Sequence, residues 1–159
     1  MPEIADPMAA LRTLQPAIDS GAVSLEPCPL HKDLSMLVDF PNGEPRTTYV
    51  VLEKGHVECI VQFLPAEPID GVPCLSIGYA TMENARNRGL ASSTLLKAID
   101  DMRFGLRRHG IRQFYVEAIV AASNTISQKV ALRALGPAMK TGSDRFSGEP
   151  IVQFVNLFA

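Results

Sequence analysis

Two arginines and a glycine at the junction of a strand and a helix form the part of this sequence with the clearest capacity for chemistry. Arg86, Arg88 and Gly89 follow an apolar strand-like run and precede a long amphipathic helix. The first N–H groups of a helix lack partners within it and lie at the positive end of its dipole, so they favour an anion. Glycine lets a ligand approach the backbone, and arginine adds charge-assisted hydrogen bonds. The junction therefore predicts a site for a multiply charged phosphate ester.

The charge distribution agrees with a polyanionic ligand. Net charge is only −2, but residues 1–85 carry −8 and residues 86–159 carry +6. A basic half that begins at the predicted phosphate loop suits such a ligand, the alternative being ordinary drift of surface charge along a chain. No run of basic residues with interleaved aromatic residues is present, so we expect no nucleic-acid partner.

Composition predicts one globular domain in a reducing cytoplasm. The chain has 159 residues, of which 47% are apolar and 20% charged. It shows neither a leader-like N-terminus nor an apolar run of about 20 residues, so we expect no membrane association. Cys28, Cys59 and Cys74 have no C-x-x-C spacing and the three histidines are scattered. We therefore expect no metal site and no disulfide framework.

Hydrophobic periodicity and turn residues predict the elements that position the junction. The first half predicts a helix from Asp6-Pro7 to Gly21, a loop at 26–33, antiparallel strands at 34–40, 47–53 and 56–64, a loop from Pro65 to Pro73 and a strand at 73–82. The second half predicts a helix from Gly89 to His109-Gly110, a strand at 113–120, a helix at 124–135 capped by Ser123 or Asn124, and a hairpin of 138–143 with 150–158. Strand, crossover helix and strand imply a parallel pair.

This order of elements resembles the GNAT acyltransferases. Arg86, Gly89 and Ala91 match the signature Gln/Arg-x-x-Gly-x-Gly/Ala of that family. Ile77-Gly78-Tyr79 upstream and Asn124-x-x-Ser127-x-x-Val130 downstream resemble the branch that acetylates ribosomal-protein N-termini. The resemblance covers about 47–159, with 72–136 as the acyl-CoA-binding core and 1–46 as a variable region.

The resemblance implies a fold and a co-substrate. The fold would be one α/β (α+β) GNAT-like domain over 1–159, with a mixed, mostly antiparallel sheet, a central parallel pair and helices on both faces. The co-substrate would be acetyl-CoA or another acyl-CoA, with no metal. The residues that would bind it are Ala80, Thr81, Met82, Arg86, Asn87, Arg88, Gly89, Leu90, Ala91, Asn124 and Ser127.

These residues would divide the acyl-CoA molecule between them. The backbone from Asn87 to Ala91 would hold the pyrophosphate, and the two arginines would reach phosphate oxygens. The strand end at 80–82 would pair with the pantetheine amides, and an N–H there would polarise the thioester carbonyl. Asn124 would bond the pantetheine arm with Ser127 nearby; the alternatives are a helix cap for Asn124 and a helix-surface position for Ser127.

Glu117 is the candidate general base, because acyl transfer to an amine needs an acceptor for the ammonium proton. Strand alternation places it with Tyr115 and Ile119, opposite its apolar neighbours. A carboxylate in an apolar strand has either a chemical task or a cationic partner, so a salt bridge to an arginine is the alternative. Glu83 is a second candidate, in a segment that we expect to be an exposed loop.

The general acid is harder to assign. Many GNAT members carry a tyrosine on the last helix, at a position that aligns near Ala131, but no tyrosine follows Tyr115. Protonation of the leaving thiolate would come from solvent or from another side chain such as Tyr79.

The predicted function is N-acyl transfer to a primary amine by direct attack in a ternary complex. The acceptor would be a small molecule or a protein N-terminus, and a homodimer is compatible with the sequence. One alternative is a catalytically idle GNAT-like module that binds acyl-CoA. Another, a nucleotide binder of a different class, lacks both Gly-x-x-x-x-Gly-Lys and Gly-x-Gly-x-x-Gly.

Overall fold

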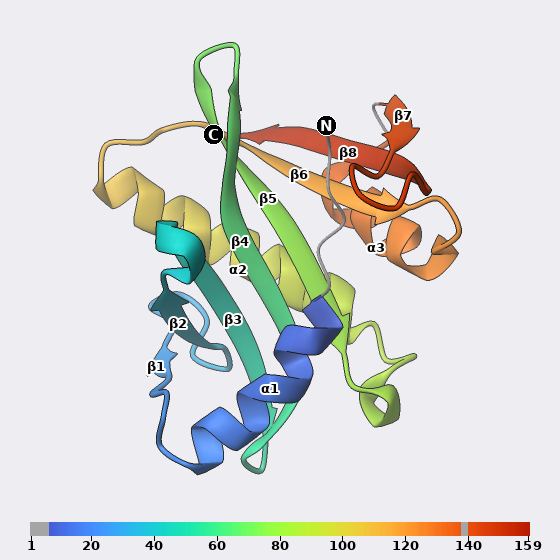
Figure 1. The fold of residues 1–159 in the computed structure, drawn as a ribbon. Helices are drawn as coiled ribbons and strands as arrows, with labels where there is room; N and C mark the ends of the chain where they lie inside the picture. Colours follow the sequence, from blue (N-terminus) through green and yellow to red (C-terminus); the bar gives the residue numbers. More distant parts are fainter. Residues whose placement is uncertain (1–6, 138–139) are drawn as a thin grey trace.

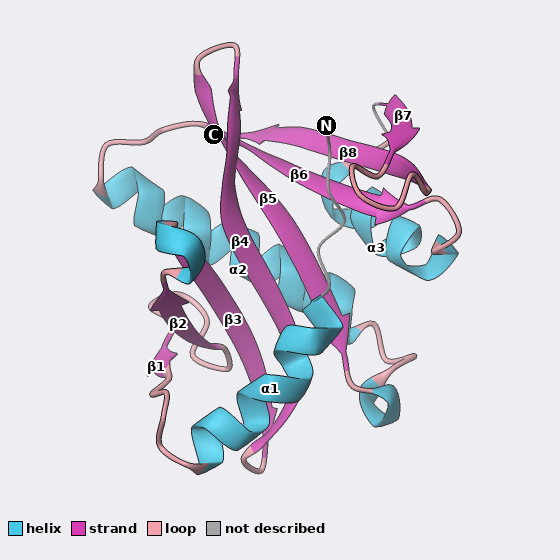
Figure 2. Ribbon diagram, in the orientation of Figure 1, coloured by secondary structure: helices cyan, strands magenta, loops and turns pink. Residues whose placement is uncertain are grey.

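An eight-stranded mixed sheet forms the centre of the molecule, with strand order β1-β2-β3-β4-β5-β6-β8-β7 (Figures 1 and 2). The computed structural model describes residues 7–137 and 140–159. The strands are β1 (Glu26–Pro27), β2 (Ser35–Asp39), β3 (Arg46–Glu53), β4 (His56–Ile69), β5 (Val72–Thr81), β6 (Phe114–Ala121), β7 (Lys140–Ser143) and β8 (Pro150–Phe158). Every neighbouring pair is antiparallel except β5 and β6. The predicted mixed sheet with a central parallel pair is confirmed.

Helices cover both faces of this sheet, as predicted. The helical segments are α1 (Pro7–Asp19), α2 (Leu90–Arg108) and α3 (Thr125–Leu135), with short 3-10 turns η1 (Pro41–Gly43) and η2 (Glu83–Ala85). Helix α1 lies on one face, where its Leu11 packs with Val50 and Ile60. Helices α2 and α3 lie on the other face, where Leu95 and Ala131 belong to the larger core (Figure 1). The two faces are called the α1 face and the α2–α3 face below.

Most of the predicted elements are present. The helix predicted after Gly89 and the strand at 113–120 correspond to α2 and β6, and Asn124 caps α3. The predicted loop at 26–33 contains the two-residue strand β1, which pairs with β2. Asp6, the expected cap of the first helix, and the first two residues of the predicted 138–143 strand lie outside the described residues. None of the described helices is long and apolar enough to span a bilayer.

The loop predicted from Pro65 to Pro73 is wrong, because β4 and β5 continue through it as a long hairpin. Their turn is Asp70-Gly71, where φ is 51° and 76°. Pairing of β3 with β4 begins at Thr47↔Phe63 and pairing of β5 with β6 begins at Cys74↔Tyr115. Pro65 and Pro73 lie beyond those pairs, at edges where no neighbouring strand needs their N–H. The prolines therefore mark free edges of the hairpin rather than a loop.

Candidate active site

The parallel strands β5 and β6 separate to form a wedge in the middle of the sheet. Their last paired residues are Ile77 and Ala118, whereas β5 continues to Thr81 and β6 to Ala121. Figure 1 shows the two strands diverging, with α2 following the end of β5 and α3 following the end of β6. The wedge thus brings into one region the start of α2, the start of α3 and the ends of β5 and β6, which are no longer paired with each other.

The backbone of β5 presents only alternate residues to the wedge. The N–H of Met82 donates to the carbonyl of Glu58 on β4 at 2.8 Å. Because hydrogen-bonded residues alternate along an antiparallel pair, Ala80 also faces β4, while Tyr79 and Thr81 direct their backbone groups toward the wedge. Of the predicted strand end at 80–82, only Thr81 presents its backbone at this edge. The backbone of Tyr79 also faces the wedge, although the sequence does not predict that it binds acyl-CoA. Which backbone groups face the wedge is decided by the register of β5 against β4, and the sequence does not show that register.

The start of α2 is an open cradle of N–H groups. The first helical bond runs from the Ser93 N–H to the Gly89 carbonyl at 3.1 Å, so the N–H groups of Leu90 and Ala91 have no acceptor within the helix. Asn87 and Gly89 have φ of 64° and 68°, and no side chain caps the helix. A Cβ built on Gly89 would meet no atom within 4 Å. The predicted segment from Asn87 to Ala91 therefore forms a space that suits an anionic group such as a pyrophosphate.

The side chains of the two arginines contact protein groups outside the cradle. The Nε of Arg86 donates to the Thr81 carbonyl at 3.1 Å, which holds the loop against the end of β5. A terminal nitrogen of Arg88 lies 3.4 Å from the Asn84 carbonyl and 3.6 Å from a carboxylate oxygen of Glu58. Arg88 is exposed, so its side chain can turn to a phosphate at low cost, whereas Arg86 has a structural partner.

Tyr79 spans the wedge and contacts α3. Its hydroxyl donates to the Ser127 carbonyl at 2.6 Å and accepts from the Ser127 hydroxyl at 2.9 Å. Burial raises the pKa of Tyr79, while the contact with Ser127 and the nearby Ala131 N–H lower it. The side-chain oxygen of Asn124 accepts from the Ser127 N–H at 3.0 Å. Asn124 is therefore a helix cap, and Ser127 is a partner of Tyr79 rather than a surface residue.

Glu117 lies on the opposite face from Tyr79. Along β6 the residues Phe114, Val116 and Ala118 are buried against α2 and α3, so Glu117 projects from the α1 face. Its carboxylate accepts from the Gln153 side-chain nitrogen at 2.7 Å. This partner is neutral, and no ion pair involves Glu117 within residues 7–137 and 140–159. Among the described residues, Glu117 therefore forms no salt bridge to an arginine, which was the alternative to a chemical role.

Nearby groups complete the description of the site. Burial and the adjacent Glu117 carboxylate raise the pKa of Cys74 to about 12, so this thiol is protonated at neutral pH. Glu83, the second candidate base, lies in η2 and is exposed, as expected. Across the described part of the chain, no group of three or more His, Cys, Asp or Glu side chains could hold a metal ion.

The site places two titratable side chains, Glu117 and Tyr79, on opposite faces of the sheet. Ser76 pairs with Glu117 one step before the strands part, and Tyr79 lies two residues beyond the last paired residue of β5. Glu117 projects from the α1 face, while Tyr79 packs with the α2–α3 core. A reacting group held in the wedge would have a carboxylate on one side and a hydroxyl on the other.

Comparison with known proteins identifies this architecture. No protein-family profile matches the chain, and no curated protein matches its sequence. Among solved structures, a GNAT-family acetyltransferase from Streptococcus pneumoniae aligns over 99% of this chain and 98% of its own, with 14% identity and a TM-score of 0.57.

Two solved structures of ribosomal-protein acetyltransferases also align with it. RimL, the ribosomal L7/L12 alpha-N-protein acetyltransferase, in complex with coenzyme A, aligns over 71% of this chain at 20% identity and a TM-score of 0.54. The acetyltransferase that modifies the N-terminal serine of L7/L12 in Salmonella typhimurium aligns over 72% at 21% identity and a TM-score of 0.53. The matches span 62% and 64% of those chains, less than two thirds of their length. At these identities the likeness establishes architecture: this chain has the GNAT fold.

Proposed function

We propose that this protein is an acyl-CoA-dependent N-acetyltransferase that transfers an acetyl group to a primary amine by direct attack in a ternary complex. The observation that carries the proposal is the wedge between β5 and β6, with Tyr79 and Glu117 on its two faces and the uncapped start of α2 beside it. Acetyl-CoA, once bound, supplies the acetyl group as an activated thioester.

In this proposal, acyl-CoA would lie between the backbone of β5 and the start of α2 on one side and the start of α3 on the other. The cradle of N–H groups from Asn87 to Ala91 would hold the pyrophosphate, and Arg88 would turn toward it. The backbone of Tyr79 and Thr81 would accept the pantetheine arm like an added strand. The start of α3 at Asn124 and Ser127 would form the opposite wall.

Two side chains would move protons. Glu117 would accept a proton from the ammonium group of the acceptor, so that the neutral amine attacks the acyl carbon. As the carbon–sulfur bond breaks, the electron pair goes to sulfur, and the Tyr79 hydroxyl would give its proton to the thiolate. As the amide forms, the nitrogen of the tetrahedral intermediate loses its second proton, which would return to Tyr79 through water, and Glu117 would release its proton to solvent. Gln153 would orient the carboxylate through the 2.7 Å hydrogen bond.

The acceptor would enter from the α1 face, where Glu117 lies. The ribosomal acetyltransferases that share the fold are described as acting on a protein N-terminus, and a small amine has the same reacting group. The charge of −8 over residues 1–85 favours a cationic acceptor at long range.

A screen of primary amines with detection of released thiol tests the proposal. Acetyl-CoA should raise the thermal midpoint where ATP and NAD do not, and at least one amine should give acetyl-CoA-dependent thiol release. Stabilisation by ATP or NAD but not by acetyl-CoA would exclude both this function and the idle module.

An acyl-CoA-binding module without turnover is the second candidate function. Ala131 stands near the position where the resemblance expects a tyrosine, and the Tyr79 hydroxyl is already bonded to Ser127. Stabilisation by acetyl-CoA without thiol release from any amine, protein N-termini included, would favour this module.

A further inference from the structure

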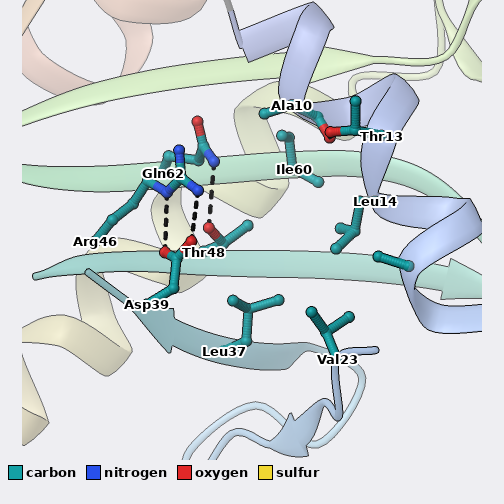
Figure 3. A pocket seen from close by; sticks show the side chains of 11 residues that line it. Ala10, Thr13, Leu14, Val23, Leu37, Asp39, Arg46, Thr48, Ile60 and Gln62 are labelled. Carbon is teal, nitrogen blue, oxygen red and sulfur yellow. Dashed lines mark hydrogen bonds and ion pairs between the residues drawn. The ribbon is translucent and has the colours of Figure 1, made fainter. Parts of the chain in front are cut away.

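A separate cavity of about 220 Å³ lies under α1, away from the wedge (Figure 3). Its lining comes from α1, the segment after it, and β2 to β4; the residues are Ala10, Thr13, Leu14, Ala17, Val23, Leu37, Asp39, Arg46, Thr48, Ile60 and Gln62. The start of α1 separates it from the wedge, because Pro7 lies over Gly78 of β5, within 3.6 Å of a Cβ built there. The cavity is therefore a second site on the α1 face.

One end of the cavity holds an ion pair, Arg46 with Asp39, in which both groups can form further hydrogen bonds. Arg46 donates to both carboxylate oxygens of Asp39, at 3.0 Å from Nε and 2.5 Å from a terminal nitrogen. The side chains of Arg46 and Asp39 keep 29% and 40% of their surface exposed. A guanidinium has five N–H donors and each carboxylate oxygen has two lone pairs, so both groups can accept a further partner. This end can thus bind an anionic and a cationic group at once.

The charge balance of the lining selects for a ligand with both charges. Asp39 and Arg46 are its two ionisable residues, so the lining carries no net charge. A ligand with a single charge would compete with one member of the pair for the other. A zwitterion adds a complementary partner to each member without breaking the pair, which Figure 3 shows as a guanidinium and a carboxylate joined by two hydrogen bonds.

The rest of the cavity is apolar with a buried polar floor. Leu14, Leu37 and Ile60 face one another from α1, β2 and β4 in Figure 3. The Gln62 side-chain nitrogen donates to the Thr48 hydroxyl at 3.3 Å, which satisfies one of its two N–H groups. This surface suits a short aliphatic group.

We propose that this cavity binds a free α-amino acid with a short aliphatic side chain. The α-carboxylate would bond to the remaining N–H groups of Arg46, the α-ammonium to Asp39, and the side chain would lie among Leu14, Leu37 and Ile60. A volume of 220 Å³ is below the roughly 300–1,000 Å³ of sites that hold drug-sized ligands, so the cavity suits a smaller molecule such as an amino acid. This site does not depend on the acyl-transfer proposal.

Calorimetric titration of the full chain with L-leucine tests the site. Leucine should bind saturably at one site per chain. 3-Methylbutylamine lacks the carboxylate, 4-methylpentanoate lacks the ammonium group and glycine lacks the side chain, so each should bind at least about tenfold more weakly because one of the contacts is lost. Acetyl-CoA is titrated in parallel, and its affinity should not change when leucine is present.

Three variants locate the binding. Ala17→Leu fills the apolar part and Arg46→Gln removes the carboxylate partner, so each should abolish or weaken leucine binding about tenfold or more while acetyl-CoA binding holds. Arg12→Gln makes the same change as Arg46→Gln at an exposed position of α1 outside the cavity, and it should leave leucine binding unchanged. Thermal melts establish that each variant is folded; if Arg46→Gln does not fold, Ala17→Leu decides the location.

Three outcomes would overturn the proposal. One is the absence of saturable heat and of any thermal stabilisation at about 10 mM leucine, well above a millimolar dissociation constant. The second is equal affinity for leucine and for either singly charged analogue. The third is leucine binding that survives Ala17→Leu, which would place the ligand elsewhere.

Discussion

The Tyr79 hydroxyl and Ser127 are joined by two hydrogen bonds across the wedge, one donated at 2.6 Å and one accepted at 2.9 Å. The hydroxyl also lies beside the Ala131 N–H, which contributes to lowering its pKa against the effect of burial. The resemblance to GNAT enzymes places their helix tyrosine near Ala131. A hydroxyl carried by β5 therefore reaches the part of α3 from which many of those enzymes supply an acid. Because burial raises the pKa of Tyr79 above its ordinary value, the hydroxyl is protonated at neutral pH.

Tyr79→Phe tests the hydroxyl as proton donor. The ring still packs with the α2–α3 core, so acetyl-CoA affinity should change less than about twofold, while kcat should fall about 10²-fold or more because the thiolate loses its acid. Steady-state kinetics with a matched binding titration measures both. Tyr115→Phe, on the other face of the sheet, is the control; equal kcat values for the two variants would remove Tyr79 from the mechanism.

Ser127→Ala tests Ser127 as a positioning residue. The Ser127 hydroxyl lowers the pKa of Tyr79, so its loss should raise that pKa and leave Tyr79 a weaker acid. We expect a lower kcat and an alkaline limb of the kcat profile that moves to higher pH. Ser127→Thr, which keeps a hydroxyl, should restore the limb. A profile that falls in height without shifting would mean that Ser127 supports the helix only.

The sequence predicts the scaffold of this site better than its contacts. The apolar spacing of Leu95, Ile99 and Met102, with the stop at Gly110, is enough to predict helix α2. The alternation of side chains along a strand is enough to place Glu117 on the opposite face from its neighbours on β6. These are local periodicities, which a single segment carries by itself. The sequence does not predict the β4–β5 hairpin, because proline penalises a strand only where a neighbouring strand needs its N–H, and that depends on where β3 and β6 begin.

The contacts of the charged and hydroxyl groups depend on distant segments. The Arg86 bond to Thr81 and the Tyr79 bonds to Ser127 follow from how the loop and α3 dock on the sheet, which no local pattern encodes. Likewise, which of Ala80, Thr81 and Met82 faces the wedge is decided by the register of β5 against β4. Residue types could be read from the sequence, but their partners could not.

Glu117→Gln tests the general base. Glutamine keeps the shape and the hydrogen bonding to Gln153 but cannot take a proton, so turnover at neutral pH should fall about 10²-fold with acetyl-CoA affinity unchanged. Below the pKa of the acceptor amine, kcat/KM of the variant should rise about tenfold per pH unit because the neutral amine must then come from solution. Glu53→Gln, an exposed change on β3, is the control. Wild-type turnover in Glu117→Gln would exclude this role.

Gly89→Ala tests the anion cradle. Gly89 has φ of 68°, so alanine should cost about 1 kcal/mol of unfolding free energy through backbone strain alone, since no atom lies within 4 Å of the new Cβ. The Cβ would occupy the approach to the N–H groups, so acetyl-CoA affinity should fall about tenfold or more. Gly105→Ala within α2 is the matched control and should instead stabilise the protein by about 0.5–1 kcal/mol. Unchanged affinity in Gly89→Ala would place the pyrophosphate elsewhere.

The buried thiols predict how stability depends on alkaline pH. Burial raises the pKa values of Cys28 and Cys74 from 9.0 to about 12, so between these values the unfolded chain loses protons that the folded chain keeps. A raised folded-state pKa means that stability is intact below pH 9 and falls as pH rises toward 12, by about 1.4 kcal/mol per pH unit for each thiol. Denaturant unfolding at a series of pH values measures this slope. Cys28→Ala should remove about one thiol's share of it, whereas Ser24→Ala at an exposed position should not; an unchanged slope in Cys28→Ala would show that this thiol ionises alike in both states.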